Sequence, residues 1–203
     1  MKLYYFETPN ARKACGVAKY LGSPVEFVRV DLGTGAQKAP EFLALNPNGR
    51  VPTLQDGDTS IWESPAIMIY LAQKAGSTLW PADAVKQADC VRWINWDTAH
   101  FSRHGSRLFW ERVIKGMFNL GEPDQAEIDD ATGFFKQFAT VLDDHLSGKD
   151  YLVGDQLSVA DFHLASILSV AEPSGLPVDG FNEIKRWNDK LLEIPAWRDA
   201  FPA

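Results

Sequence analysis

A hydroxyl and an amide that could bind an anion flank a proline near the start of the chain, in Thr8-Pro9-Asn10. Thr8 is a good helix N-cap, and Pro9 suits the first helical position because its missing N–H would be unsatisfied there. A helix that begins here directs free N–H groups and the positive end of its dipole beyond the preceding strand. Thr8 and Asn10 are therefore candidate donors to a negatively charged ligand, with helix capping alone as the alternative.

A proline at the mouth of a predicted strand marks a second candidate, within the run from Asn46 to Leu54. Pro52 cannot donate a ladder hydrogen bond, and a cis Val51–Pro52 bond would account for it by making a tight turn. Such a turn leaves the backbone N–H and C=O of Val51 free to pair with an extended, peptide-like ligand. The alternative is an ordinary loop that contains proline.

The run Glu63-Ser64-Pro65 again places a cap residue before a proline. Ser64 is predicted to cap a helix whose N-terminal amides are open to a carboxylate, and Glu63 could receive an ammonium group. Two helix N-termini and one carboxylate suit a zwitterionic ligand with a free amino-acid end. Capping at the surface is the competing interpretation.

Aromatic and basic side chains spaced by three or four residues would lie on one stripe of a helix: Trp93, Trp96, His100, Arg103, Arg107 and Trp110. Such a stripe suits an apolar, partly anionic co-substrate, and we take Trp96, His100, Arg103 and Arg107 as candidates for that site. The alternative is a stripe that packs in the helical core. His100 and His104 are an i, i+4 pair without a third ligand nearby, so we predict no metal site.

The two cysteines, Cys15 and Cys90, are predicted to be buried and inert. Cys15 lies inside a predicted helix with apolar neighbours at helical spacing. The chain has no C-x-x-C run, which excludes a thioredoxin-type dithiol mechanism. Two cysteines do not make a secreted disulfide framework, so we expect a reducing compartment.

The predicted secondary structure that positions these groups differs between the first and the later part of the chain. In the first part, patterns predict strands at 3–6, 25–30, 51–54 and 59–62, and helices at 11–21, 40–45 and 65–75. The first strand, helix and strand form a unit with a right-handed crossover, and Asp56-Gly57 signals a hairpin. The order β-α-β-α-β-β-α predicts an α/β sheet of the thioredoxin-like kind.

The later part is helical throughout, with helices expected at 86–115, 125–146, 159–171 and 181–192 and a last turn near Ala196. We expect Gly105 and Gly116 to bend or break the first of these. The predicted organisation is a thioredoxin-like ligand-binding domain at 1–76, a stiff linker at 77–84 and an all-α bundle at 85–203. Ser158 and Asp161 have capping-box spacing, and Leu157 and Phe162 have staple spacing, which is a structural signal.

The amino-acid composition argues against a nucleic-acid-binding or membrane-spanning protein. The chain has 203 residues, 45% of them hydrophobic, and a formal net charge of -7. An acidic chain is a poor partner for nucleic acid, and no apolar run approaches the ~20 residues that span a bilayer. Glu7 interrupts the N-terminal apolar residues, which argues against a signal peptide.

Along its whole length the chain resembles the cytosolic glutathione transferases. The landmarks that carry the resemblance are Thr8-Pro9-Asn10, Pro40-Glu41-Phe42-Leu43, the run from Asn46 to Leu54, Glu63-Ser64 with Ala66, Ile67, Tyr70 and Leu71, and the run from Tyr151 to Phe162. The resemblance implies glutathione as co-substrate, with no other cofactor and no metal. It also implies a detoxifying transferase that is cytoplasmic and homodimeric, with a small hydrophobic electrophile as second substrate and no nucleic-acid or membrane partner.

By the same resemblance, Val51 and Pro52 meet the cysteinyl backbone of glutathione, and Glu63 and Ser64 hold its γ-glutamyl end. The glycyl carboxylate is then approached by Gln37, Lys38 and Arg50. Gln37 stands where many relatives have histidine, and a solvated surface charge is the alternative for Lys38.

The Thr8-Pro9-Asn10 run is similar to the Nu-class and related bacterial enzymes, in which the threonine hydroxyl and asparagine amide face the glutathione sulfur. An ordinary thiol has a pKa of about 8.5, and lowering it by ~2 units, or ~2.7 kcal/mol, makes thiolate the main form at neutral pH. Two alternatives stay open: glutathione-dependent reduction of disulfides or peroxides, and non-catalytic binding of hydrophobic ligands. Glu63, Ser64 and Val51-Pro52 disfavour loss of glutathione binding.

Overall fold

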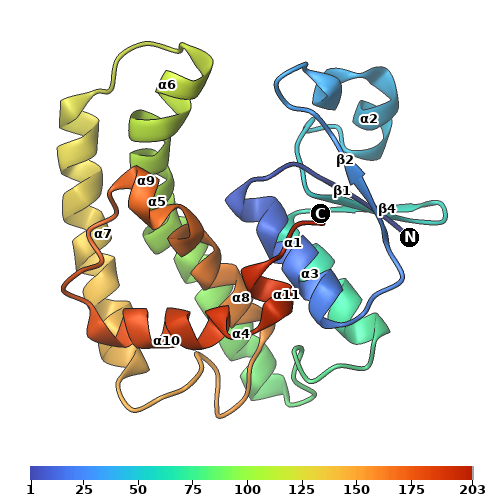
Figure 1. Cartoon of the computed structure of the whole chain (residues 1–203). Helices are drawn as coiled ribbons and strands as arrows, with labels where there is room; N and C mark the ends of the chain where they lie inside the picture. Colours follow the sequence, from blue (N-terminus) through green and yellow to red (C-terminus); the bar gives the residue numbers. More distant parts are fainter. Residues whose placement is uncertain (203) are drawn as a thin grey trace. The chain divides into compact units, whose positions relative to one another are not determined.

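The computed structural model describes residues 1–202, which divide into two compact units (Figure 1). The first unit is Met1–Trp80 together with the chain from Glu193, and the second is Pro81–Leu192. Residues 193–202 fall within the predicted helical domain, 85–203, whereas the structure groups them with the first unit. The physical reason is that α11 (Pro195–Arg198) packs against the first helix.

The first unit contains a four-stranded mixed sheet in the order β2-β1-β3-β4. The strands are β1 (Lys2–Tyr5), β2 (Glu26–Arg29), β3 (Thr53–Asp56) and β4 (Thr59–Trp62). β1 pairs with β2 in parallel and with β3 antiparallel, while β3 and β4 form the predicted hairpin. The thioredoxin-like fold predicted for this part of the chain is confirmed.

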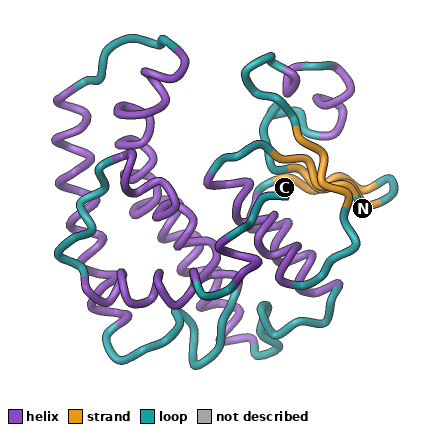
Figure 2. Tube along the Cα trace, viewed as in Figure 1, coloured by secondary structure: helices purple, strands orange, loops and turns teal. Residues whose placement is uncertain are grey.

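Helices cover both faces of this sheet (Figures 1 and 2). α1 (Pro9–Tyr20) and α3 (Ser64–Lys74) pack against each other on one face. On the other face lie the 3-10 turn η1 (Ala36–Lys38) and α2 (Pro40–Leu45), where Phe42 meets the Tyr4 ring edge-on at 5.8 Å. Fully buried apolar side chains join the layers, among them Leu3, Val17, Leu54, Ile67 and Met68.

The residues of α11 lie against α1. The Arg12 Nη2 donates to the Trp197 carbonyl at 2.6 Å, and its guanidinium lies 4.7 Å from the centre of the Trp197 ring. Gly16 leaves room for that ring, because a Cβ at Gly16 would lie 2.7 Å from Trp197 Cε3. The absence of a side chain at Gly16 therefore allows the Trp197 ring of α11 to pack directly on α1.

The second unit is helical. A long, interrupted helical stretch comprises α4 (Ala84–Trp96), the π-helical turn η2 (Asp97–Phe101), α5 (Ser102–Phe109), the π-helical turn η3 (Trp110–Ile114) and α6 (Lys115–Phe118). It is followed by α7 (Gln125–Leu146), α8 (Val159–Ala165), the 3-10 turn η4 (Ser166–Val170), α9 (Ala171–Ser174) and α10 (Asn182–Leu192).

The interruptions of the first long stretch do not fall at the expected glycines. Gly105 lies within α5 and Gly116 within α6, so neither glycine breaks its helix. A Cβ at Gly105 would lie 2.7 Å from Ile167 Cγ1, which shows that this glycine allows close packing between α5 and η4. The irregular turns are π-helical instead, at 97–101 and 110–114.

The capping-box aspartate connects three parts of the second unit. Asp161 is fully buried and accepts hydrogen bonds from the Ser158 N–H and the Leu152 N–H, each at 2.9 Å, and from Trp187 Nε1 at 3.0 Å. The predicted capping box at Ser158 and Asp161 is confirmed. Through residues 1–202, the described helices include none with the length and apolar character needed to cross a membrane.

Candidate functional site

Six of the predicted ligand-binding residues line a cavity of about 80 Å³ in the first unit, whereas Thr8, Gln37 and Lys38 are not among its lining residues. Its lining contains Asn10 from the first turn of α1, the loop that precedes β3, and the N-terminus of α3. The lining residues are Asn10, Asn46, Arg50, Val51, Pro52, Glu63 and Ser64. Chain segments more than fifty residues apart thus bring six of the predicted site residues together.

Thr8 caps α1, as predicted. Its Oγ1 accepts a hydrogen bond from the Ala11 N–H at 3.2 Å, and the side chain is half-buried. A hydroxyl has two lone pairs and one proton, so accepting this bond leaves the proton available to a ligand. Capping and anion binding, which the sequence leaves as alternatives, are therefore compatible at Thr8.

The cap of α3 differs from the prediction. Glu63, not Ser64, is the N-cap, with φ 70° and ψ 118°, and its side chain makes no capping bond. A non-glycine residue in this region costs about 1–3 kcal/mol and is typical of functional sites. Ser64 becomes the first helical residue and is only 5% exposed. Across residues 1–202 the structure records no hydrogen bond to its hydroxyl, which lines the cavity without serving as a cap.

The loop before β3 presents its backbone to the same cavity. The Val51–Pro52 peptide bond is cis, as predicted, and Pro52 is buried. Within the described residues, neither the N–H nor the C=O of Val51 has a hydrogen-bond partner in the protein. An extended ligand could therefore pair with this residue as a strand would.

Gln37 and Lys38 lie beside this loop, although they do not line the cavity. Gly49 adopts φ +59°, and a Cβ there would lie 2.9 Å from the Gln37 carbonyl oxygen and 3.6 Å from Lys38 Nζ. The turn at Gly49, which precedes Arg50, therefore packs the loop before β3 closely against η1. Gln37 Oε1 is buried without a hydrogen-bond partner among residues 1–202, while the Lys38 side chain is exposed.

The aromatic and basic stripe of the second unit packs mainly against α7. The His100 ring stacks on Phe138 with centroids 4.5 Å apart, and Trp96 meets the same ring edge-on at 6.0 Å. Arg107 pairs with Glu127 at 2.5 Å and with Asp130 at 2.7 Å. For Trp96, His100 and Arg107, these contacts favour a role in packing the helices over a role in binding a co-substrate. Arg103 alone of the four is exposed.

A buried acid–base pair in the second unit has no sequence signal. His163 Nε2 lies 3.1 Å from Asp97 Oδ2, and both side chains are almost fully buried. Ser102 donates to the other oxygen of Asp97 at 2.7 Å. More than sixty residues separate His163 from Asp97, and no local sequence pattern links them.

Both cysteines are buried, as predicted. Burial raises the pKa of the Cys15 thiol to about 12 and that of Cys90 to about 11. At neutral pH neither supplies a useful fraction of thiolate, and the thiolate is the nucleophile in thiol chemistry. Neither cysteine of the protein is therefore suited to act as a nucleophile at neutral pH.

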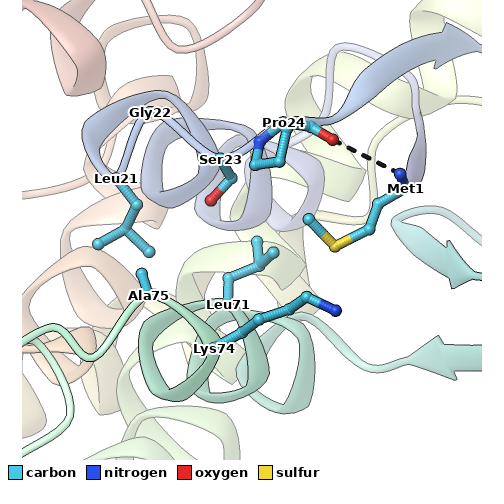
Figure 3. Close-up of a pocket in the computed structure, with 8 residues that line it drawn as sticks. All are labelled: Met1, Leu21, Gly22, Ser23, Pro24, Leu71, Lys74 and Ala75. Carbon is cyan, nitrogen blue, oxygen red and sulfur yellow. Dashed lines mark hydrogen bonds between the residues drawn. The ribbon is translucent and has the colours of Figure 1, made fainter.

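A larger cavity, of about 220 Å³, lies at the opposite ends of α1 and α3 (Figure 3). Its lining is mostly apolar: Met1, Leu21, Gly22, Ser23, Pro24, Leu71, Lys74 and Ala75. The Lys74 ammonium is already paired with Asp56. None of the predicted site residues lines this cavity, so the smaller cavity is the candidate site despite its size.

Comparisons with known proteins agree with this architecture. Residues 1–73 match the sequence model for the glutathione S-transferase N-terminal domain, and residues 100–195 match that for the C-terminal domain. Glutathione S-transferase 3 of Zea mays is 33% identical over 210 residues, which cover 100% of this chain and 94% of that protein.

Two solved structures are similar over nearly the whole chain. Glutathione S-transferase-I bound with lactoylglutathione has a TM-score of 0.88 at 29% identity, covering 98% of this chain and 97% of its own. A glutathione transferase family member from Pseudomonas fluorescens, with two glutathione bound, has a TM-score of 0.87 at 26% identity, with 98% and 91% covered. Together with the matched domains, these likenesses establish that the chain belongs to the glutathione S-transferase family.

Proposed function

We propose that the protein binds glutathione in the smaller cavity, ionises its thiol beside Thr8 and Asn10, and transfers the thiolate to a small hydrophobic electrophile. The observation that carries the proposal is the state of the Thr8 hydroxyl. Its Oγ1 accepts the Ala11 N–H at 3.2 Å, which leaves its proton free to donate to a sulfur anion. The likeness to proteins solved with glutathione or lactoylglutathione supports the choice of co-substrate.

The proposed pose assigns each end of glutathione to a group of matching charge or polarity. The γ-glutamyl end meets the Glu63 carboxylate through its ammonium group, and the Ser64 hydroxyl and the N-terminus of α3 through its carboxylate. The cysteinyl backbone pairs with Val51, and the glycyl carboxylate extends toward Gln37, Lys38 and Arg50. In this pose the cysteinyl sulfur lies near the first turn of α1, where Asn10 lines the cavity.

The mechanism needs only charge stabilisation of the thiolate. A hydroxyl, an amide and the positive end of the α1 dipole each favour the anion over the neutral thiol. Together they supply the ~2.7 kcal/mol that shifts a thiol pKa by ~2 units. The thiol releases its proton to water. The thiolate then attacks the electrophilic carbon, a C–S bond forms, and the leaving group departs with the electron pair of the broken bond.

Substitution of Thr8 tests the proposal. Thr8→Val keeps the shape but removes the hydroxyl, so the pKa of the bound thiol should rise by about 1–2 units, which is the value of one hydrogen bond to a charged group. Ultraviolet titration of the thiolate in the glutathione complex measures this pKa. Thr8→Ser is the matched control and should retain the low pKa. An unchanged pKa in a folded Thr8→Val protein would refute the role of Thr8.

Substitution of Asn10 separates a role at the sulfur from a role in binding. Asn10→Ala should reduce turnover more than it reduces glutathione affinity, whereas equal losses would contradict contact with the sulfur. A panel of an aryl halide, an organic hydroperoxide and a small disulfide then assigns the reaction. Turnover of the aryl halide supports transfer, and turnover of the hydroperoxide or disulfide alone supports reduction. Glutathione binding without any turnover supports a ligand binder.

The finer assignment to the bacterial Nu-class type rests on Thr8-Pro9-Asn10 alone, since the similar proteins include plant and bacterial members. A homodimer and a cytoplasmic location are further parts of the proposal, and both rest on the family resemblance. Light scattering at several protein concentrations tests the dimer.

A further inference from the structure

A buried amide outside the set of predicted site residues lies in the wall of the smaller cavity. Asn46 is the C-cap of α2 and is 2% exposed. Its Nδ2 donates to the Arg50 carbonyl at 2.8 Å and to Thr53 Oγ1 at 3.0 Å. Its Oδ1 accepts from the backbone N–H and from the side-chain Nδ2 of Asn48, each at 3.0 Å. Both donor hydrogens and the acceptor oxygen are engaged, so the protein itself fixes the orientation of this amide.

A second buried side chain completes the arrangement. Thr53 is fully buried, and its Oγ1 donates to the Arg50 carbonyl at 3.1 Å while accepting from Asn46. The Arg50 carbonyl thus receives two hydrogen bonds from buried groups, although the Arg50 side chain itself is exposed. Buried polar groups that are fully paired hold a single geometry, because any rotation would leave a donor or acceptor unsatisfied.

The geometry of a peptide group transmits this constraint to the next residue. The Arg50 C=O and the Val51 N–H belong to one planar, trans peptide unit, in which the two bonds point in opposite directions. A carbonyl held against Asn46 and Thr53 therefore directs the Val51 N–H away from them. Because Val51 lines the cavity and its N–H has no partner within residues 1–202, this N–H is left for a ligand.

From this arrangement we infer that Asn46 is a positioning residue for glutathione: with Thr53, it aims the Val51 N–H at the cysteinyl backbone by holding the Arg50 carbonyl. The inference rests on the proposed function, since it assigns a cause to one contact of the proposed pose. It places the effect on binding of glutathione and not on ionisation of its thiol, which depends on Thr8 and Asn10.

Isosteric substitutions separate this role from a general effect on the fold. Asn46→Asp keeps the shape but replaces both N–H donors by a carboxylate oxygen that faces the Arg50 carbonyl. Thr53→Val removes the second donor to the same carbonyl, and Thr53→Ser restores it. Asn48→Ala is the matched control, because the exposed Asn48 side chain contacts Asn46 Oδ1 but not Arg50.

The measurements are the Kd for glutathione, kcat at saturating glutathione, the KM for the electrophile and the pKa of the bound thiol, with folding checked by thermal unfolding. Asn46→Asp and Thr53→Val should each raise the Kd for glutathione about tenfold, as expected for loss of one well-directed hydrogen bond. The other three quantities should stay near the wild-type values. Thr53→Ser and Asn48→Ala should bind glutathione as the wild type does.

Wild-type affinity in folded Asn46→Asp and Thr53→Val proteins would overturn the inference, as would a loss of kcat without a loss of affinity. If Asn46→Asp does not fold, the comparison of Thr53→Val with Thr53→Ser decides the question. Failure of the proposed function is recognised separately, because the wild-type protein itself would then not bind glutathione, and the inference would fall with it.

Discussion

At the scale of single residues, the site depends on groups that keep a hydrogen-bonding capacity after the fold has used them. The Thr8 hydroxyl caps α1 through a lone pair and keeps its proton. Ser64 is spared from capping because Glu63 takes that position at positive φ. The fold thus leaves a hydroxyl at each of two helix N-termini, where anions bind well.

The cysteine thiols provide a prediction at the same scale. Because burial raises the pKa of Cys15 to about 12 and that of Cys90 to about 11, under roughly 1% of either thiol is ionised at pH 8. The native protein should therefore react at least about a hundredfold more slowly with a dithiobis-nitrobenzoate reagent than the urea-unfolded protein does. A Cys15→Ser, Cys90→Ser double variant should retain transferase activity. Fast labelling of the native protein, or loss of activity in the double variant, would point back to a protein thiol.

At the scale of elements, glycines control how closely helices approach each other. Gly16 makes room for the Trp197 ring on α1, and Gly105 makes room for Ile167 on α5. Neither glycine ends its helix. Each is placed where a Cβ would lie 2.7 Å from a packed side chain.

Two helical glycines give a prediction with a built-in control. Gly105→Ala should lower the free energy of unfolding by about 1–3 kcal/mol, because the added methyl group overpacks against Ile167. Gly133→Ala, on the exposed side of α7 with no atom within 4 Å of the new Cβ, should raise it by about 0.5–1 kcal/mol. Urea unfolding followed by circular dichroism measures both. Equal effects of the two substitutions would contradict the packing role of Gly105.

At the scale of the whole molecule, one buried and one half-buried histidine should make stability depend on pH. Burial lowers the pKa of His104, with the neighbouring Arg107 and Arg103 acting in the same direction. Burial also lowers the pKa of His145, and Lys149 adds to the effect. A histidine whose pKa is lower in the folded state binds protons more readily when unfolded. The stability that each contributes is complete above the unfolded pKa of about 6.5 and is lost as the pH falls below it.

Unfolding experiments at pH 7.5 and pH 5.5 test this dependence. The free energy of unfolding should be lower at pH 5.5, and a His104→Gln, His145→Gln double variant should show a smaller difference between the two pH values. Carboxylates with lowered pKa, such as Glu7 and Glu111, lose their stabilising effect only at more acidic pH. They therefore do not contribute to the difference in stability between pH 7.5 and pH 5.5. An identical pH dependence in the variant would exclude these histidines as the cause.

Local patterns predicted the sheet, the capping box and most of the small cavity's lining, because strand alternation, cap residues and proline act over a few residues. The Asn46 hydrogen bonds, the pairing of His163 with Asp97 and the packing of His100 on Phe138 were not predictable in this way. Each joins side chains whose relation depends on how a loop or two helices pack. Likewise, the capping of α3 by Glu63 required a positive φ that the sequence does not signal.

The return of α11 to the first helix has a practical consequence for anyone who wants to isolate the thioredoxin-like half. A fragment cut after Trp80 would lose the Trp197 ring from the groove at Gly16 and leave the Arg12 guanidinium without its carbonyl partner. A usable minimal module would have to splice residues 193–202 onto the excised half through an artificial tether. The first compact unit is therefore defined by contacts in space and not by an unbroken stretch of the chain.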